Sequence, residues 1–205
     1  TPKTSSAASD VYKRQHLNSA LFDLLSSGVG LRQAARKLGL SRRCTELKFR
    51  KIARHLRRLN LRLRERLDGK RRFHLDEFES YEGQRNTRPV TIPMLIESDT
   101  RYIVWAESAP IRPSGKMTPK RLDAIARAEA RYGPRRTLSS RAVRRTLARG
   151  VAFIEPEASV ILRTDKKSTY PRLARNAFGA DRTTHLRTDS KLERTVWNPL
   201  FPINH

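Results

Sequence analysis

The sequence predicts an α/β protein in which a mixed sheet flanked by helices follows an all-helical region. Two observations support this prediction. In residues 16–72, apolar side chains recur at the three-and-four spacing of amphipathic helices. From residue 73 onward, short apolar runs bounded by Gly and Pro alternate with further helical segments, which is typical of strands joined by helices. The chain is therefore divided into a tail (1–15), a helical region (16–70) and a mixed region (71–205).

The charge of the chain is strongly positive. Lys and Arg total 44 against 20 Asp and Glu, for a formal net charge of +24. Such an excess calls for a polyanionic partner, and double-stranded DNA is the natural one, with RNA as the alternative. No run is long enough to span a membrane, and no signal-peptide pattern is present, so we expect no membrane partner. The single cysteine, Cys44, argues against a disulfide framework and favours the cytoplasm.

Both ends of the chain have an unusual character. Ser5–Gln15 reads SSAASDVYKRQ, which resembles the translation of a sequencing-library adaptor; an ordinary disordered tail is the alternative. We expect no structural element in residues 1–15. At the other end, FPINH follows an apolar and aromatic stretch without a terminating pattern, so we expect the mixed region to be truncated at its C-terminus.

The helical region contains a helix-turn-helix pattern. An apolar helix beginning near Leu17 is broken at residues 26–28, and a short helix around Ala34 follows. Gly39 suits the turn, and Ser41 is a good N-cap for the next helix. In such a motif the second helix enters the major groove by its N-terminal residues. The expected DNA contacts are Arg32, Arg36, Ser41, Arg42, Arg43, Thr45 and Lys48. A small helical hairpin without DNA-binding function is the alternative.

A long basic helix is expected after this motif. Apolar residues from Phe49 to Leu63 keep helical spacing, and Lys and Arg fill most of the positions between them. At this density of positive charge we expect contact with DNA phosphates. The apolar seam either packs on the preceding helices or pairs two copies into a homo-oligomer.

In the mixed region, the sequence pattern predicts three strands, then two helices, a strand, a helix and a last strand. Thr118 and Pro119 form a cap-then-proline helix start, and Gly133 and Gly179 end helices. The expected strands are 73–81, 89–98, 102–109, 159–164 and 184–188, and the expected helices are 118–132, 139–149 and 170–178.

Two aspartates lie on or at the end of these strands. Asp76 belongs to HLDEFESY (74–81), and Asp165 to VILRTDKKSTYP (160–171). Carboxylates buried together repel each other unless a divalent cation neutralises them, so the pair indicates a Mg²⁺ site for phosphoryl transfer. Glu77 points to the opposite strand face and is not preferred as a ligand. His74 lies on the face of Asp76, where a structural role is favoured over contact with a phosphate.

The stretches LDEFESY and RTDKKSTYP, following the helix-turn-helix pattern, resemble bacterial insertion-sequence transposases with a DDE catalytic core. The segment SKLERT (190–195) resembles the stretch around the third acid of one such group. The resemblance spans roughly residues 30–205. It implies a ribonuclease H-like fold, in which the first strand and its neighbour, the fourth, carry the first two acids. The catalytic and metal-binding residues implied are Asp76, Asp165 and Glu193; a third acid beyond the end of the chain is the alternative to Glu193.

The resemblance also implies the activity. Two Mg²⁺ ions, or Mn²⁺ in their place, would support cleavage and strand transfer of transposon-end DNA in the nucleoid of a bacterial cytoplasm. Lys166 and Lys167 would contact the scissile backbone. A fragment that lacks its third acid would be inactive. The alternative function is a non-catalytic helix-turn-helix regulator with an α/β effector domain, which gives no reason for Asp76 and Asp165 to meet.

Overall fold

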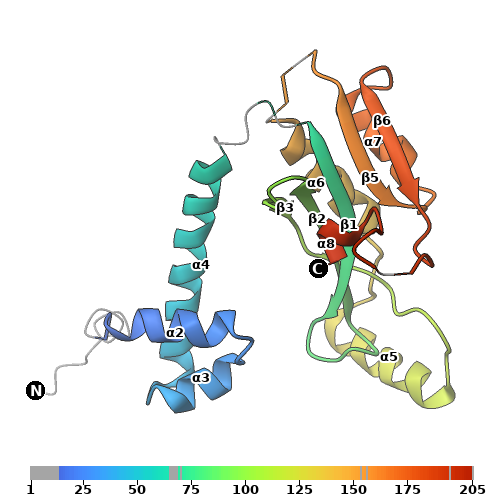
Figure 1. Cartoon of the computed structure of the whole chain (residues 1–205). Helices are drawn as coiled ribbons and strands as arrows, with labels where there is room; N and C mark the ends of the chain where they lie inside the picture. Colours follow the sequence, from blue (N-terminus) through green and yellow to red (C-terminus); the bar gives the residue numbers. More distant parts are fainter. Residues whose placement is uncertain are drawn as a thin grey trace, which may run out of the picture. The chain divides into compact units, whose positions relative to one another are not determined.

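The computed structural model describes residues 14–64, 69, 71–152, 154–155, 157–193 and 195–204. The chain divides into two compact units, 1–66 and 67–205, and each is described by itself (Figure 1).

The described residues of the first unit form the helices α2 (Leu17–Ser26), α3 (Leu31–Lys37) and α4 (Arg42–Arg64). Leu21 of α2 and the small side chains of Ala34 and Ala35 on α3 are buried between them. The turn after α3 has Gly39 in the left-handed region, at φ +60°. The hydroxyl of Ser41 then accepts a hydrogen bond from the Cys44 N–H at 3.1 Å, so the predicted turn and N-cap are present.

The second unit is built on a mixed sheet. Its strands are β1 (Arg72–Tyr81), β2 (Pro89–Glu97), β3 (Ile103–Ala106), β4 (Ala109–Pro110), β5 (Val160–Asp165) and β6 (Thr183–Thr188). The order across the sheet is β3-β2-β1-β5-β6, and β4 pairs with β2. The first three strands are antiparallel neighbours, whereas β5 runs parallel to β1 and β6 parallel to β5. The predicted α/β class with a mixed sheet flanked by helices is confirmed.

One strand boundary was predicted wrongly. The expected strand 102–109 is two short strands, β3 and β4, which residues 107–108 separate. There the carboxylate of Glu107 forms an ion pair with Arg145 at 2.9 Å.

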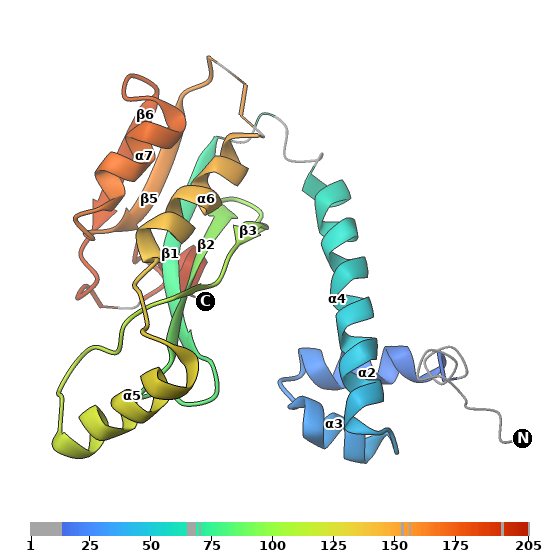
Figure 2. The ribbon, with the colours of Figure 1, turned by 180° about the vertical axis from the view of Figure 1, so that it is seen from behind.

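The helices described in this unit are α5 (Pro119–Tyr132), α6 (Ser139–Val151), α7 (Tyr170–Phe178) and α8 (Phe201–Asn204). Helices α6 and α7 cover one face of the sheet (Figure 2). Strand alternation directs Phe73 and Leu75 of β1 into the core beneath them. Gly150 lets α6 approach β2 closely, since a Cβ there would lie 2.5 Å from the side chain of Leu95.

The other face of β1 is contacted by the C-terminal segment. The Nε2 of His74 lies 3.0 Å from the carbonyl oxygen of Pro199, which can only accept, so Nε2 carries the proton. The hydroxyl of Ser98 donates to Nδ1 at 3.3 Å. Burial lowers the pKa of His74, in keeping with a neutral ring that fastens this segment to the sheet. No helix in the described ranges has the length and apolar character needed to cross a membrane.

Candidate functional site

Asp76 and Asp165 lie on neighbouring parallel strands. The register of β1 on β5 pairs Arg72 with Ile161 and His74 with Arg163. The same offset, continued two residues along both strands, sets Asp76 opposite Asp165. Two residues that are far apart in the sequence are therefore brought to the same level of the sheet.

The two aspartates also share a face. Leu75 of β1 and Thr164 of β5 are fully buried under the helices. Because side chains alternate along a strand, the next residue of each strand, Asp76 or Asp165, faces the other way. Both aspartates are partly exposed. The carboxylates are consequently on the sheet face that α6 and α7 leave uncovered.

The backbone fixes one oxygen of each carboxylate. Oδ1 of Asp76 accepts the Glu77 N–H at 2.7 Å, and Oδ1 of Asp165 accepts the Lys167 N–H at 2.9 Å. The carboxylates also act on the hydroxyl of Tyr170. Burial raises the pKa of Tyr170 far above its usual value, and the charges of Glu77, Asp165 and Asp76 raise it further.

The donor set of this pair fits a hard cation. Carboxylate oxygens are the protein ligands that Mg²⁺ and Mn²⁺ prefer, and Asp76 and Asp165 supply them from two fixed strands. Glu193 does not join them. It is exposed in the segment after β6, where its carbonyl oxygen accepts a hydrogen bond from Asn198. Within the described ranges no three His, Cys, Asp or Glu side chains gather as metal ligands, so the expected three-acid set is not assembled.

Sequence reasoning missed the role of Glu77. Its carboxylate accepts hydrogen bonds from the hydroxyls of Thr91 and Ser139, both at 2.7 Å, and from the hydroxyl of Tyr170 at 3.0 Å. It also forms an ion pair with Lys167. One buried carboxylate thus joins β1, β2, α6, α7 and the loop after β5. The sequence contained a signal for this role. Side chains alternate along a strand, so Glu77 falls on the core face with Leu75, and a Glu on that face requires polar partners.

These partners keep Glu77 ionised. Burial alone would raise the pKa of Glu77, but the hydrogen bonds from Lys167, Thr91 and Ser139 outweigh it and bring the pKa below its usual value. The ammonium of Lys167 donates to Ser139 as well, at 3.1 Å. Lys167 was expected to contact DNA; its ammonium pairs with Glu77, and its side chain is 38% exposed. Lys166 is exposed and forms an ion pair with Asp189 at 3.2 Å.

In the first unit, three of the expected DNA contacts meet around one hollow. Arg32 and Arg36 of α3 and Arg42 of α4 line a cavity of about 460 Å³. Arg43 and Ser41 beside it are exposed as well. The start of α4 therefore presents guanidinium groups from two helices to solvent.

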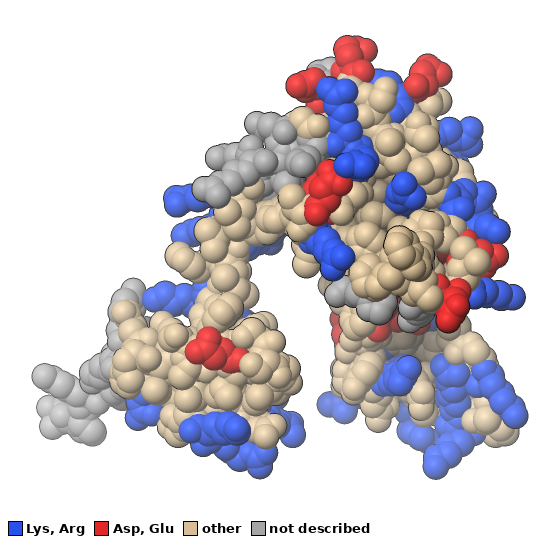
Figure 3. All heavy atoms as spheres, viewed as in Figure 1, with Lys and Arg blue, Asp and Glu red and all other residues tan. Residues whose placement is uncertain are grey.

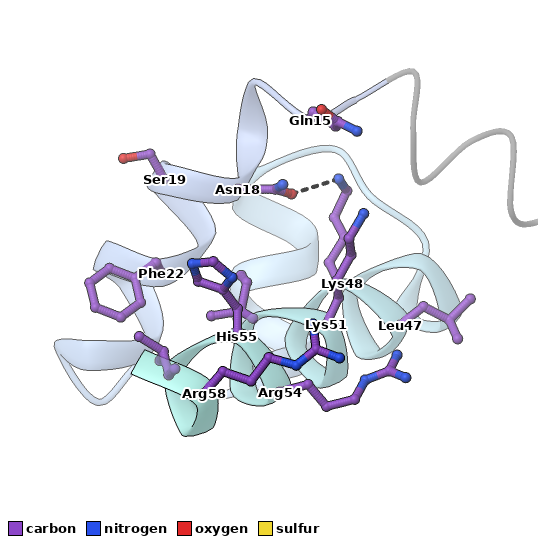
Figure 4. A pocket seen from close by; sticks show the side chains of 12 residues that line it. Gln15, Asn18, Ser19, Phe22, Leu47, Lys48, Lys51, Arg54, His55 and Arg58 are labelled. Carbon is purple, nitrogen blue, oxygen red and sulfur yellow. Dashed lines mark hydrogen bonds between the residues drawn. The ribbon is translucent and has the colours of Figure 1, made fainter. Parts of the chain in front are cut away.

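Thr45 and Lys48 were expected DNA contacts, and this expectation is wrong. Thr45 is fully buried, and its hydroxyl donates to the carbonyl of Ser41 at 3.0 Å. Lys48 is 1% exposed. Its ammonium donates to Oδ1 of Asn18 and to the carbonyl of Arg14, both at 2.8 Å, and Figure 4 shows the first of these bonds. Burial lowers the pKa of Lys48. Lys48 therefore joins α4 to α2 and to the chain before it.

The groove of Figure 4 lies between α2 and α4 and has a volume of about 890 Å³. Phe22 and Ile52 are among its apolar lining, and Lys51, Arg54 and Arg58 line it with charge. At the start of the apolar seam of α4, Phe49 is 41% exposed and Ile52 is partly buried. Farther along, the seam is exposed: Leu56 by 40%, Leu59 by 46% and Leu63 by 37%.

Most of the predicted tail, residues 1–13, lies outside the described residues. Arg14 is described, and its guanidinium donates to the carbonyl of Gly39 at 3.1 Å. Comparison of the chain with known protein families, curated proteins and solved structures gives no match.

Proposed function

We propose that this chain is part of a DNA transposase of the DDE type, which cleaves and joins DNA with a divalent cation held by Asp76 and Asp165. The observation that carries the proposal is that Asp76 and Asp165 lie on one face of neighbouring parallel strands, at positions that the strand register, extended by two residues, sets opposite each other. Two carboxylates that lie side by side repel each other, and a bound divalent cation would relieve this repulsion.

The sheet supports the ribonuclease H-like interpretation. An order of β3-β2-β1-β5-β6, with three antiparallel strands followed by two parallel ones, sets the strand of the first acid beside that of the second. This adjacency is what the proposed fold requires. The site lies in a protein whose positive charge would draw DNA from the bacterial nucleoid to it.

Each group of residues has its own role in this proposal. Asp76 and Asp165 would hold the cation beside a phosphodiester. A bound Mg²⁺ would lower the pKa of an attacking water and stabilise charge on the phosphate. Glu77 and Lys167 hold the two strands and the β5–α7 loop in place. In the first unit, Arg32, Arg36, Arg42 and Arg43 contact the DNA, in the manner of a helix-turn-helix.

A binding experiment separates the metal site from the activity. Mn²⁺ titration followed by electron paramagnetic resonance should show binding that Asp76→Asn and Asp165→Asn each weaken by at least about tenfold. Glu79→Gln, which removes an exposed acid from the same strand, is the matched control and should change nothing. Glu193→Gln should also have no effect on Mn²⁺ binding, because Glu193 stands apart from the pair.

Activity is then measured on DNA that carries the sequences flanking the gene. In Mg²⁺ the protein should nick and join this DNA, and Asp76→Asn should abolish cleavage while leaving DNA binding intact. Equal Mn²⁺ affinity in the wild-type protein and both aspartate variants would reject the proposal.

A non-catalytic helix-turn-helix regulator is the second candidate. The observation that favours it is that no third metal ligand joins Asp76 and Asp165 within the part of the chain that the structure describes. It predicts DNA binding through the first unit without any Mn²⁺ site in the second.

A further inference from the structure

A basic hollow lies in the second unit between α5 and the loop that joins β1 to β2. It has a volume of about 570 Å³ and is lined by Glu82, Gly83, Gln84, Thr87, Arg88, Ala124, Arg127, Ala128, Arg131 and Tyr132. None of these residues belongs to the aspartate pair. Figure 3 shows Lys and Arg side chains gathered over the part of the molecule that α5 forms.

The walls of the hollow are fixed by two other arginines. Arg135 donates to the carbonyl of Pro89 at 2.6 Å and pairs with Glu82 at 3.0 Å. Arg121 donates to the carbonyl of Asn86 at 3.3 Å. These bonds attach both ends of α5 to the β1–β2 hairpin. Because α5 buries none of its residues, polar bonds rather than apolar packing hold the hollow in shape.

The single acid that lines the hollow is already neutralised. The carboxylate of Glu82 is shared by Arg88 and Arg135, each 3.0 Å away, and these two partners lower its pKa. The guanidinium of Arg88 also stacks on the ring of Tyr132, at 4.3 Å from its centroid. The remaining charge of the lining is therefore positive.

Two arginines of the lining have no acidic partner among the residues that the structure describes. Arg127 and Arg131 are one helical turn apart on α5, and within the described ranges neither guanidinium has a hydrogen bond or an ion pair. Arg131 only stacks against the ring of Tyr132, at 5.1 Å. Like charges at this spacing destabilise a helix, and an anion between them would reverse the effect.

We propose that this hollow binds the phosphate backbone of DNA, with Arg127 and Arg131 as its ligands and the Tyr132 ring holding the neighbouring guanidiniums in place. Paired guanidiniums match the geometry of a phosphate, which each can contact through two N–H groups. The inference rests on the proposed function in taking DNA as the partner, but it does not depend on the metal chemistry of Asp76 and Asp165.

The test is a titration of labelled duplex DNA by fluorescence anisotropy in EDTA, where no cleavage occurs, at several salt concentrations. The variant Arg127→Gln/Arg131→Gln keeps helix propensity and removes two exposed charges. Its affinity should fall by about tenfold or more, and the slope of log affinity against log salt should become shallower by about 2. The matched control, Arg172→Gln/Arg175→Gln on α7, removes the same charge and should keep the slope. Arg127→Lys/Arg131→Lys should restore the slope but only part of the affinity.

The outcomes separate this inference from the proposed function. Equal losses in the α5 and α7 variants would overturn the hollow as a DNA site and leave the aspartate pair untouched. DNA binding with the predicted slopes but no cleavage in Mg²⁺ would support the hollow and reject the enzyme. A wild-type protein without DNA affinity would overturn both. Micromolar inorganic pyrophosphate is added as a competitor of the labelled DNA. If it displaces the DNA from the wild-type protein and has no such effect on the α5 variant, the hollow would be assigned to a free phosphate compound in place of DNA.

Discussion

Glu77 and Lys167 form an ion pair, and their backbone N–H groups hold the two aspartates. The side chains meet on the helix-covered face of the sheet. The N–H of Glu77 donates to Asp76, and the N–H of Lys167 donates to Asp165. Each partner of the buried pair therefore positions one carboxylate of the candidate metal site on the opposite face. The pair is a structural support for the site and does not itself face the cation.

The first prediction concerns this support. Glu77→Gln should lower the free energy of unfolding by about 1–3 kcal/mol, because the ammonium of Lys167 and three hydroxyl donors lose a charged acceptor. Lys167→Met should also destabilise, and the double variant should cost less than the sum of both, as measured in a urea double-mutant cycle. Glu79→Gln is the control, within about 0.5 kcal/mol of wild type. If the losses of unfolding free energy in the two single variants add up to the loss in the double variant, Glu77 and Lys167 have no coupling energy.

The second prediction is a loss of stability on acidification. Burial lowers the pKa of His74 and of His185 in the folded protein, so the unfolded chain binds more protons below the ordinary histidine pKa of about 6.5. The free energy of unfolding should therefore fall as the pH falls from 7.5 to 5.5. Glu77, whose pKa is also lowered on folding, adds a second loss below about pH 4.3.

A variant assigns the first of these losses. His74→Gln keeps a donor for Pro199 and an acceptor for Ser98 but cannot titrate. Urea midpoints at pH 7.5 and 5.5 should differ less in this variant than in the wild-type protein. An unchanged difference would exclude His74 as the group that titrates.

The third prediction separates buried from exposed basic residues in the first unit. Lys48→Ala should destabilise by about 1–3 kcal/mol, since Asn18 and the Arg14 carbonyl lose their donor. The folded fraction of this variant should bind DNA as the wild-type protein does. Arg42→Ala should do the reverse, with stability within about 0.5 kcal/mol of wild type and a salt slope of binding shallower by about 1. A larger DNA defect in Lys48→Ala than in Arg42→Ala would contradict the assignment.

The fourth prediction concerns the contact of α6 with the sheet. Gly150→Ala would normally strengthen a helix, but its Cβ would lie 2.5 Å from the fully buried side chain of Leu95. We expect a net loss of about 1–3 kcal/mol in thermal or urea unfolding. Adding Leu95→Val should recover part of it, because the shorter side chain makes room. A stabilised Gly150→Ala protein would show that the core relaxes without cost.

Local features of this protein could be predicted from its sequence. Ser41 and Thr118 cap helices, Gly39 makes a turn, and β5 ends at Asp165, all through interactions between residues close in the chain. The helix from Tyr170 to Phe178 was predicted with its correct bounds because a proline at its start and Gly179 at its end are local signals.

Pairings across the chain were decided by the tertiary structure. Nothing near Lys48 in the sequence shows that Asn18 lies within hydrogen-bond reach, and a basic residue on a helix was therefore assigned to DNA. The structural role of Glu77 was missed for the same reason, because its four partners come from four other segments.

The sequence by itself determined the element types, the positive charge and the strand positions of Asp76 and Asp165, since these follow from spacing and composition. Only the tertiary structure decided which acids meet and which cations are used inside the protein. The strand register brings Asp76 to Asp165 and leaves Glu193 exposed in the last loop. Strand pairing joins residues without regard to their separation in the chain, so no local pattern fixes it.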